Sequence, residues 1–338
     1  MGPEDQQLIF CLRNNEFFMA LGLFNKPVYD EVVSTAKAFG DALMKLGAKY
    51  KNMVVLDANA GRSLNLAGFA RAFPDRYFNF GNAESNMIGA AAGFTVRGKI
   101  PLVCSFSMFI TGRAWEEIRN AVAYPLLNVK FIGAFSGILC GEDGATYQAL
   151  EDVALMRAIP NMKIACPADS VQTKQVLETM MNDYGPTYLR LANSAMNNLY
   201  DDDRKFEFGK GDVYRAGTDV CIFSYGDSFH SSLRAAEILE RDGVSTMVVN
   251  LASLKPLDEA LVIECAKQAS HVFTIEDHQV GGGLGSAVAE VLTTSYPCKL
   301  TRLGMDGFGE SGKAEDLYKK YRLDPLGIYE QVRDLIHL

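Results

Sequence analysis

The chain has 338 residues, of which 48% are hydrophobic, and a formal net charge of −8. This length allows about two domains with substantial cores, and the acidic balance argues against nucleic acid or an anionic membrane as the main partner. Seven widely spaced cysteines without a C-x-x-C motif fit buried thiols in a reducing compartment. With no long apolar run and an acidic start unlike a signal peptide, we expect a cytoplasmic protein that binds neither nucleic acid nor membrane and holds no metal of its own.

Apolar periodicity predicts alternating helices and buried strands after a mixed leader over residues 1–29. The expected helices cover 30–48, 115–123, 148–156, 170–181, 229–242 and 284–292. The expected strands cover 53–57, 100–104, 129–133, 163–167, 187–191, 220–223, 246–250 and 272–276. This alternation predicts two doubly wound α/β domains with mostly parallel sheets, over 30–200 and 212–338, joined by a polar linker at 201–211.

Glu84 is the single charged residue in the run 80–94, which is otherwise rich in Ala and Gly. Burial of a carboxylate removes its hydration, which raises its pKa and favours the protonated form. Glu84 is therefore a candidate proton donor to a ring nitrogen of a ligand. A helix N-terminus whose acid complements the helix dipole explains the same pattern, and the spacing alone slightly favours this second interpretation. Glu84 and Asp143 both follow predicted strands, where ligands bind in sheets of this type.

Four further features each allow a functional and a structural interpretation. Glu142 and Asp143 lie in a glycine-flanked loop and suit either a metal or sugar hydroxyl, or the start of a helix. The glycine-rich stretch 281–285 lacks the G-x-G-x-x-G spacing, so a tight strand-to-helix turn is favoured over a phosphate site. Phe106 and Phe109 are more typical of a core than of a cofactor platform. The one histidine in a motif, in the sequence Ile275-Glu276-Asp277-His278, is more typical of a structural role.

From about residue 30 to its end, the chain resembles the C-terminal half of transketolase, in the split form in which this half is a separate polypeptide. The segments that carry the resemblance are Leu56-Asp57-Ala58, the Glu84 run, Thr111-Gly112-Arg113-Ala114-Trp115-Glu116, Gly141-Glu142-Asp143-Gly144-Ala145-Thr146, Ile159-Pro160-Asn161-Met162, Leu254-Lys255-Pro256-Leu257-Asp258 and Phe308-Gly309-Glu310-Ser311-Gly312. The resemblance implies a pyrimidine-binding domain for thiamine diphosphate, followed by a transketolase C-terminal domain.

The resemblance also implies roles for individual residues and a partner chain. Glu84 stands where the family's catalytic glutamate hydrogen-bonds N1′ of the cofactor's aminopyrimidine and so activates it. Phe109 stands where an aromatic ring packs on the pyrimidine, with Phe106 nearby. The family's magnesium-binding Gly-Asp-Gly motif is missing, since Gly211-Asp212-Val213 breaks it. An N-terminal partner subunit that binds the diphosphate and Mg²⁺ is therefore implied, in an α2β2 assembly.

The chain departs from the family at four positions near the expected substrate. No histidine occurs in the first 229 residues, and Phe135 and Tyr147 stand in place of two histidines. Ala36 and Asn193 stand in place of two arginines that bind the substrate phosphate in the family. Each lost charge-assisted bond is worth ~1.5–3 kcal/mol. These losses favour a donor or acceptor other than an ordinary sugar phosphate, in specialised metabolism.

Two substrate contacts of the family remain, Ser63 toward phosphate and Asp143 toward a hydroxyl group. An ordinary sugar-phosphate transketolase subunit stays possible if Lys37 or Arg62 compensates for the lost arginines. A non-catalytic regulatory paralogue is a third hypothesis, although the retained Glu84 argues against it. Other thiamine enzymes, such as deoxyxylulose-phosphate synthase or the β subunit of a 2-oxo-acid dehydrogenase, fit the run 145–152 less well.

Overall fold

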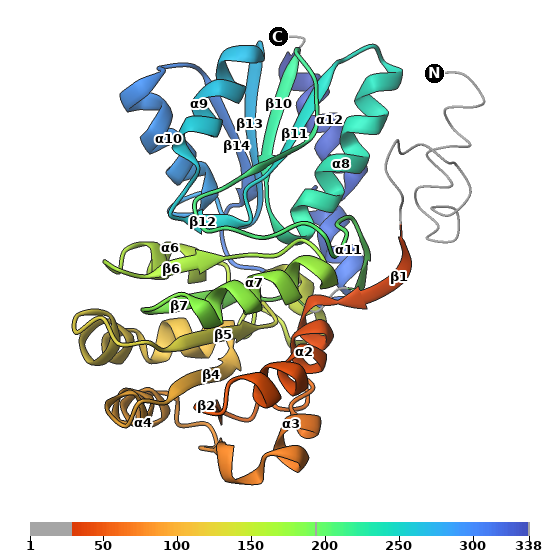
Figure 1. Ribbon diagram of the computed structural model, residues 1–338. Coiled ribbons are helices and arrows are strands. Elements are labelled where there is room, and N and C mark those ends of the chain that lie inside the picture. Colours follow the sequence, from red (N-terminus) through yellow and green to blue (C-terminus); the bar gives the residue numbers. More distant parts are fainter. Residues whose placement is uncertain (1–28, 193–194, 337–338) are drawn as a thin grey trace.

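The computed structural model describes residues 29–192 and 195–336. Most of the expected leader and Asn193 therefore lie outside the described residues. The described chain forms two sheets of mostly parallel strands, each flanked by helices, which lie one above the other in Figure 1. This arrangement confirms the predicted α/β class with two mostly parallel sheets.

Among the described residues, the first sheet contains, in spatial order, β12 (Ser253–Lys255), β6 (Lys163–Ala165), β7 (Thr187–Arg190), β5 (Lys130–Ala134), β4 (Ile100–Phe106), β2 (Met53–Asp57) and β3 (Tyr77–Asn79). Its strands pair in parallel, except that β12 runs antiparallel to β6. The central strands β2 and β5 are buried along their whole length, as expected for a parallel sheet covered on both faces. Since β12 comes from the second half of the chain, the two halves share this sheet.

The helices around the first sheet are α2 (Thr35–Lys49), α3 (Ala67–Ala72), α4 (Glu84–Val96), α5 (Trp115–Glu117), α6 (Asp152–Arg157) and α7 (Ser170–Asn182). Shorter turns are the 3₁₀ helices Pro74–Arg76 and Ile138–Asp143 and the π-helical segments Phe109–Arg113 and Ile118–Ala123. The predicted helix 148–156 is wrong in its first turn, because α6 begins only at Asp152.

The predicted helix 30–48 is also wrong at its start. A strand, β1 (Tyr29–Ser34), comes first and pairs antiparallel with β8 (Ala195–Asn198). The helix α2 then begins at Thr35, where the Ser34 hydroxyl accepts a hydrogen bond from the Lys37 amide at 3.2 Å. This side-chain cap satisfies an amide that has no partner within the helix and so fixes where the helix begins.

In the described part of the chain, the second sheet consists of β14 (Leu300–Met305), β13 (His271–Gln279), β10 (Val220–Ser224), β11 (Thr246–Asn250) and β9 (Asp212–Arg215), of which β9 is antiparallel to its neighbour. The accompanying helices are α8 (Gly226–Arg241), α9 (Glu259–Gln268), α10 (Leu284–Ser295), α11 (Ala314–Lys320) and α12 (Pro325–Ile336). None of the helices within the described ranges is both long and apolar enough to cross a bilayer.

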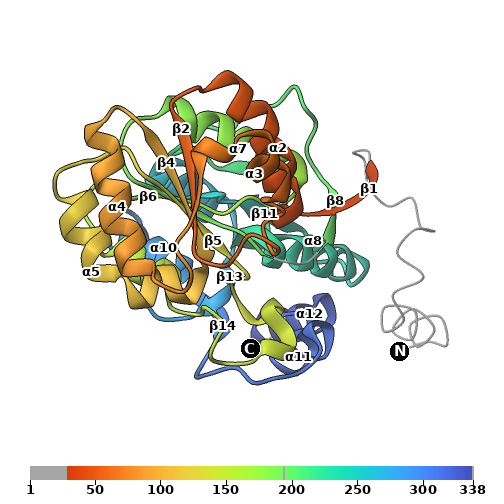
Figure 2. The same cartoon turned by 90° about the horizontal axis from the view of Figure 1, so that it is seen from below.

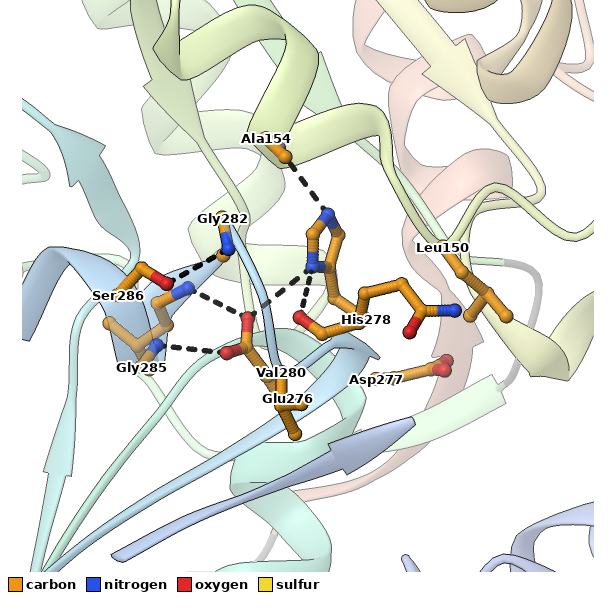
Figure 3. A network of polar contacts seen from close by, with 12 residues as sticks. Leu150, Ala154, Glu276, Asp277, His278, Val280, Gly282, Gly285 and Ser286 are labelled. Carbon is orange, nitrogen blue, oxygen red and sulfur yellow. Dashed lines mark hydrogen bonds and ion pairs between the residues drawn. The ribbon is translucent and has the colours of Figure 1, made fainter. Parts of the chain in front are cut away.

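A buried polar network joins the two halves where β13 meets α6 (Figure 3). The Ala154 amide donates to His278 Nε2 at 3.3 Å, and His278 Nδ1 lies 2.7 Å from the Gln279 carbonyl. The Glu276 carboxylate accepts from the amides of Leu284 and Gly285, at 2.7 and 2.8 Å. Glu276 thus takes the place that a phosphate would need at the start of α10. This geometry supports the tight turn over 281–285 and a structural role for His278.

Candidate active site

Glu84 is the first residue of α4 and lies just beyond the carboxyl end of β3. Its side chain is only 1% exposed. Ser105, in the neighbouring strand β4, donates to Glu84 Oε1 at 3.1 Å, and Arg113 Nη1 lies 2.6 Å from Oε2. The run 80–94 carries no other charge, but the fold brings a guanidinium to Glu84 from 29 residues further along the chain.

Arg113 is the site residue that sequence reasoning missed. It ends the π-helical segment Phe109–Arg113, and its guanidinium carbon lies 4.6 Å from the centre of the Phe109 ring. A planar, nitrogen-rich group thus bridges the buried carboxylate and an aromatic face. The four-residue spacing from Phe109 is one at which side chains meet on a helix, and this spacing is the signal that was available.

Four half-buried aromatic rings form a cluster beside this pair, defined here as Phe106, Phe109, Phe135 and Tyr147. The ring centres of Phe109 and Tyr147 are 4.9 Å apart. Phe106 contacts the other three rings, with ring centres 5.3–6.0 Å apart. The rings meet at steep angles, the edge-to-face arrangement that aromatic pairs favour. The structure therefore gathers these residues near the carboxyl ends of β4 and β5. It leaves Phe106 and Phe109 only half buried, outside the core.

Phe135 holds an unusual backbone conformation within this cluster. Its φ is +56°, in the left-handed region that bulky residues rarely adopt. It follows the last residue of β5, so the chain turns sharply where the strand ends. Strained residues of this kind concentrate at functional sites, because the surrounding structure must hold them in place.

The Glu142–Asp143 pair lies in the 3₁₀ helix that follows β5, with both side chains exposed. The two acids stand at the end of this 3₁₀ helix, and the next helix, α6, begins only at Asp152. The interpretation of these acids as the start of a helix is therefore wrong. Cys140 Sγ lies 3.9 Å from Asp143 Oδ2. Burial, with the Asp143 charge as a second cause, raises the pKa of Cys140 to about 12, so this thiol is not a nucleophile at neutral pH.

The remaining expected substrate contacts are less closely gathered. Ser63 is half buried in the turn between β2 and α3, at the same edge of the sheet. Asn193 is outside the described residues. Within residues 29–192 and 195–336, no group of three or more His, Cys, Asp or Glu side chains is arranged to hold a metal ion.

Comparison with known proteins gives consistent matches over both halves of the chain. Residues 31–198 match the family described as "Transketolase, pyrimidine binding domain", and residues 209–328 match "Transketolase, C-terminal domain". A Methanocaldococcus jannaschii protein named as a transketolase C-terminal section is 46% identical, over 88% of this chain and 95% of its own. The 6-deoxy-6-sulfo-D-fructose transketolase subunit of a Clostridium species is 37% identical, over 84% of this chain and 88% of its own.

A solved structure described as a split gene transketolase, inactive beta4 tetramer, superposes with a TM-score of 0.84 and 41% identity. The match covers 90% of this chain and 99% of that one, so it extends over both sheets. The family matches, the relatives and the fold agree with one another. The chain belongs to the transketolase family, as a protein similar to its separately encoded C-terminal subunits.

Proposed function

We propose that this chain is the C-terminal subunit of a two-chain transketolase-like enzyme that depends on thiamine diphosphate and transfers a two-carbon ketol unit. Glu84 activates the aminopyrimidine of the cofactor, and the donor or acceptor is not an ordinary sugar phosphate. The observation that carries the proposal is the buried Glu84 carboxylate beside the face of Phe109, with a planar guanidinium between them.

The site residues fit the pyrimidine half of the cofactor. A planar ring with nitrogen donors needs a carboxylate at its edge and an aromatic face, and the Arg113 guanidinium already has both contacts. The diphosphate half requires a metal site, and the described residues include no cluster of metal ligands. The fit therefore supports a shared site, in which a partner subunit binds the diphosphate and Mg²⁺.

When bound, thiamine diphosphate supplies the nucleophilic carbon that carries the ketol unit. Glu84 would hydrogen-bond the pyrimidine nitrogen N1′ through its carboxyl group, while Ser105 fixes the orientation of that group through the bond to Oε1. Phe109 would offer its ring face to the pyrimidine, and Tyr147 packs against Phe109 with ring centres 4.9 Å apart. Low hydration strengthens the hydrogen bond that Glu84 makes, because the local dielectric is low.

The aromatic cluster supports an unusual substrate. Phe135 and Tyr147 occupy positions where the resemblance implies histidines, so these positions carry neither an imidazole nor a positive charge. Relatives of this chain include subunits named for 6-deoxy-6-sulfo-D-fructose and for apulose 4-phosphate. Split subunits of this family are thus named for uncommon sugars, which supports a role in specialised metabolism.

A surface beside Glu84 suits a partner chain. The outer face of α4 exposes Asn86, Gly89, Gly93 and Val96, and a Cβ placed on either glycine would meet no atom within 4 Å. Small residues allow another backbone to approach closely. This face continues from the N-terminal end of α4, where Glu84 lies, so a chain docked here would reach the cofactor site. An α2β2 assembly satisfies this requirement.

The proposal is tested by reconstitution. The purified chain, its partner subunit and their mixture are each assayed with thiamine diphosphate, Mg²⁺, hydroxypyruvate as ketol donor and glycolaldehyde as acceptor. Transfer is expected only from the mixture, and it should vanish when a chelator removes Mg²⁺. Ketol transfer by this chain alone would refute the need for a partner.

A further inference from the structure

The loop 137–148 follows Phe135 and brings Tyr147 back to the aromatic cluster. Seen from below, its 3₁₀ helix lies against α11 of the second half of the chain (Figure 2). Three sets of contacts join this loop to the second half, at its beginning, middle and end. Its only ring in the aromatic cluster, that of Tyr147, is next in sequence to the last contact.

The first contact holds the beginning of the loop. The Ile138 amide donates to Asp277 Oδ1 at 3.0 Å, and both groups are buried. Gly137 has a φ of +76°, and a Cβ on it would lie 1.9 Å from Asp277 Oδ2. The close approach of the carboxylate therefore requires glycine at position 137.

The second contact holds the middle of the loop. The Ser311 hydroxyl donates to the Glu142 carbonyl at 2.6 Å. A Cβ on Gly144 would lie 3.3 Å from the Ser311 backbone, so the two segments run close together here. Asp143 lies between these two contact positions of the loop, so its backbone is held on both sides.

The third contact is a buried side-chain amide. Gln148 is 2% exposed, and its Nε2 donates to the Glu310 carbonyl at 2.9 Å and to the Gly141 carbonyl at 3.4 Å. Its Oε1 has no hydrogen-bond partner among the described residues. A Cβ on Gly309 would lie 2.0 Å from this oxygen. Gly309 thus leaves the room that the amide occupies.

We propose that Gln148 is a positioning residue through which segment 309–311 of the second half sets the position of Tyr147, and so the shape of the expected substrate site. This inference rests on the proposed function. A buried polar group that is only partly satisfied is costly, whereas an apolar side chain would fill the same space without that cost. The amide adds a directional hydrogen bond between the loop and the second half of the chain, and buried hydrogen bonds of this kind favour one relative position of the groups they join.

The test uses the complex with its partner subunit and four variants of this chain. Gln148→Ala removes the amide, and Gly309→Ala displaces it from the opposite side. In the second variant the nearest atom is the end of a flexible side chain, so the backbone need not move. The double variant tests whether the two act through one contact. Lys320→Ala is the control, because it removes the exposed ion pair of Glu310 and leaves the Glu310 carbonyl unchanged.

Three quantities are measured: backbone hydrogen exchange over residues 138–148, the KM of glycolaldehyde as acceptor with hydroxypyruvate as donor, and hydrogen–deuterium exchange at C2 of the cofactor. Gln148→Ala and Gly309→Ala should each speed exchange in the loop and raise the acceptor KM by about tenfold or more. In the double variant, loop exchange and the acceptor KM should be no higher than in either single variant. Cofactor exchange should stay within about twofold of the wild type, since Glu84 is untouched.

The inference is overturned if loop exchange matches that of Lys320→Ala, if the effects of the two single variants add, or if cofactor exchange falls together with acceptor binding. Failure of the proposed function has a different signature. The wild-type complex would then transfer no ketol group, whereas loop exchange would still separate the Gln148 and Gly309 variants from the control.

Discussion

Arg113 and Glu84 form an ion pair, with Nη1 and Oε2 2.6 Å apart, in which the carboxylate is 1% exposed and the guanidinium side chain 47% exposed. The two partners therefore differ in what they lose when the other is removed. Arg113 can turn to water, while Glu84 would keep a buried charge with the Ser105 hydroxyl as its remaining hydrogen-bond donor among the described residues. This asymmetry separates the effects of the two substitutions.

Arg113→Met should lower the free energy of unfolding of the cofactor-free chain by about 1–3 kcal/mol, because it leaves a buried acceptor unpaired. Glu84→Gln combined with Arg113→Met should recover most of that loss, since the buried charge is then absent. Urea unfolding of the single and double variants measures both values. Arg119→Met, at an exposed position of the following π-helical segment Ile118–Ala123, is the control and should leave stability unchanged. Equal losses in the single and double variants would contradict this account of the pair.

Substrate preference is expected to depend on Phe135 and Asn193. Phe135→His together with Asn193→Arg should raise kcat/KM for a phosphorylated acceptor, relative to its unphosphorylated form, by about tenfold to a hundredfold. The reason is that a charge-assisted bond to phosphate contributes ~1.5–3 kcal/mol. Parallel assays of the two acceptors with the reconstituted complex give the ratio, and Phe135→His alone serves as the control. An unchanged ratio would mean that these positions do not line the substrate site.

Lys130 should make stability depend on pH in the alkaline range. Its Nζ donates to the carbonyls of Asp183 and Gly185, both at 2.8 Å, and burial lowers the pKa of Lys130 to about 7. Between this value and the ordinary lysine pKa of about 10.4, the unfolded chain binds a proton that the folded chain lacks. This lysine therefore makes stability rise with pH across that window, by up to about 1.4 kcal/mol per pH unit.

The comparison of wild type with Lys130→Met isolates this contribution. Denaturant unfolding is measured between about pH 6 and pH 10. The free energy of unfolding of the wild type should increase relative to that of the variant as pH rises above 7, whereas below that pH the difference between the two should stay constant. Curves that stay parallel over the whole range would show that Lys130 keeps its proton when the chain folds.

Sequence patterns predicted the elements whose burial leaves a local apolar pattern, and they missed elements that form through contacts with distant parts of the chain. The strand 53–57 was recognised because a strand buried on both faces is a continuous apolar run. The strand β14 was missed because it is only half buried and carries an exposed Arg302. The start of α2 was misplaced because β1 exists only through its pairing with β8, which follows it by more than 150 residues in the chain.

The same distinction holds for the site. Glu84 was found from its own neighbours in the sequence, and the placement of Phe135 and Tyr147 near the expected substrate was taken from the resemblance. The pairing of Arg113 with Glu84, and of Gln148 with a carbonyl 162 residues away, depends on tertiary contacts that leave no local pattern. Sequence reasoning therefore identified the candidate catalytic group but not the groups that hold it or the loop beside it.

The measurement that tests the central claim most directly is hydrogen–deuterium exchange at C2 of thiamine diphosphate in the reconstituted complex. Wild-type complex and complex carrying Glu84→Gln are compared at equal cofactor occupancy, which is checked separately by a binding titration. If Glu84 activates the aminopyrimidine, the variant should exchange slower by about a hundredfold or more. Exchange at the wild-type rate in the fully loaded variant would contradict the assignment.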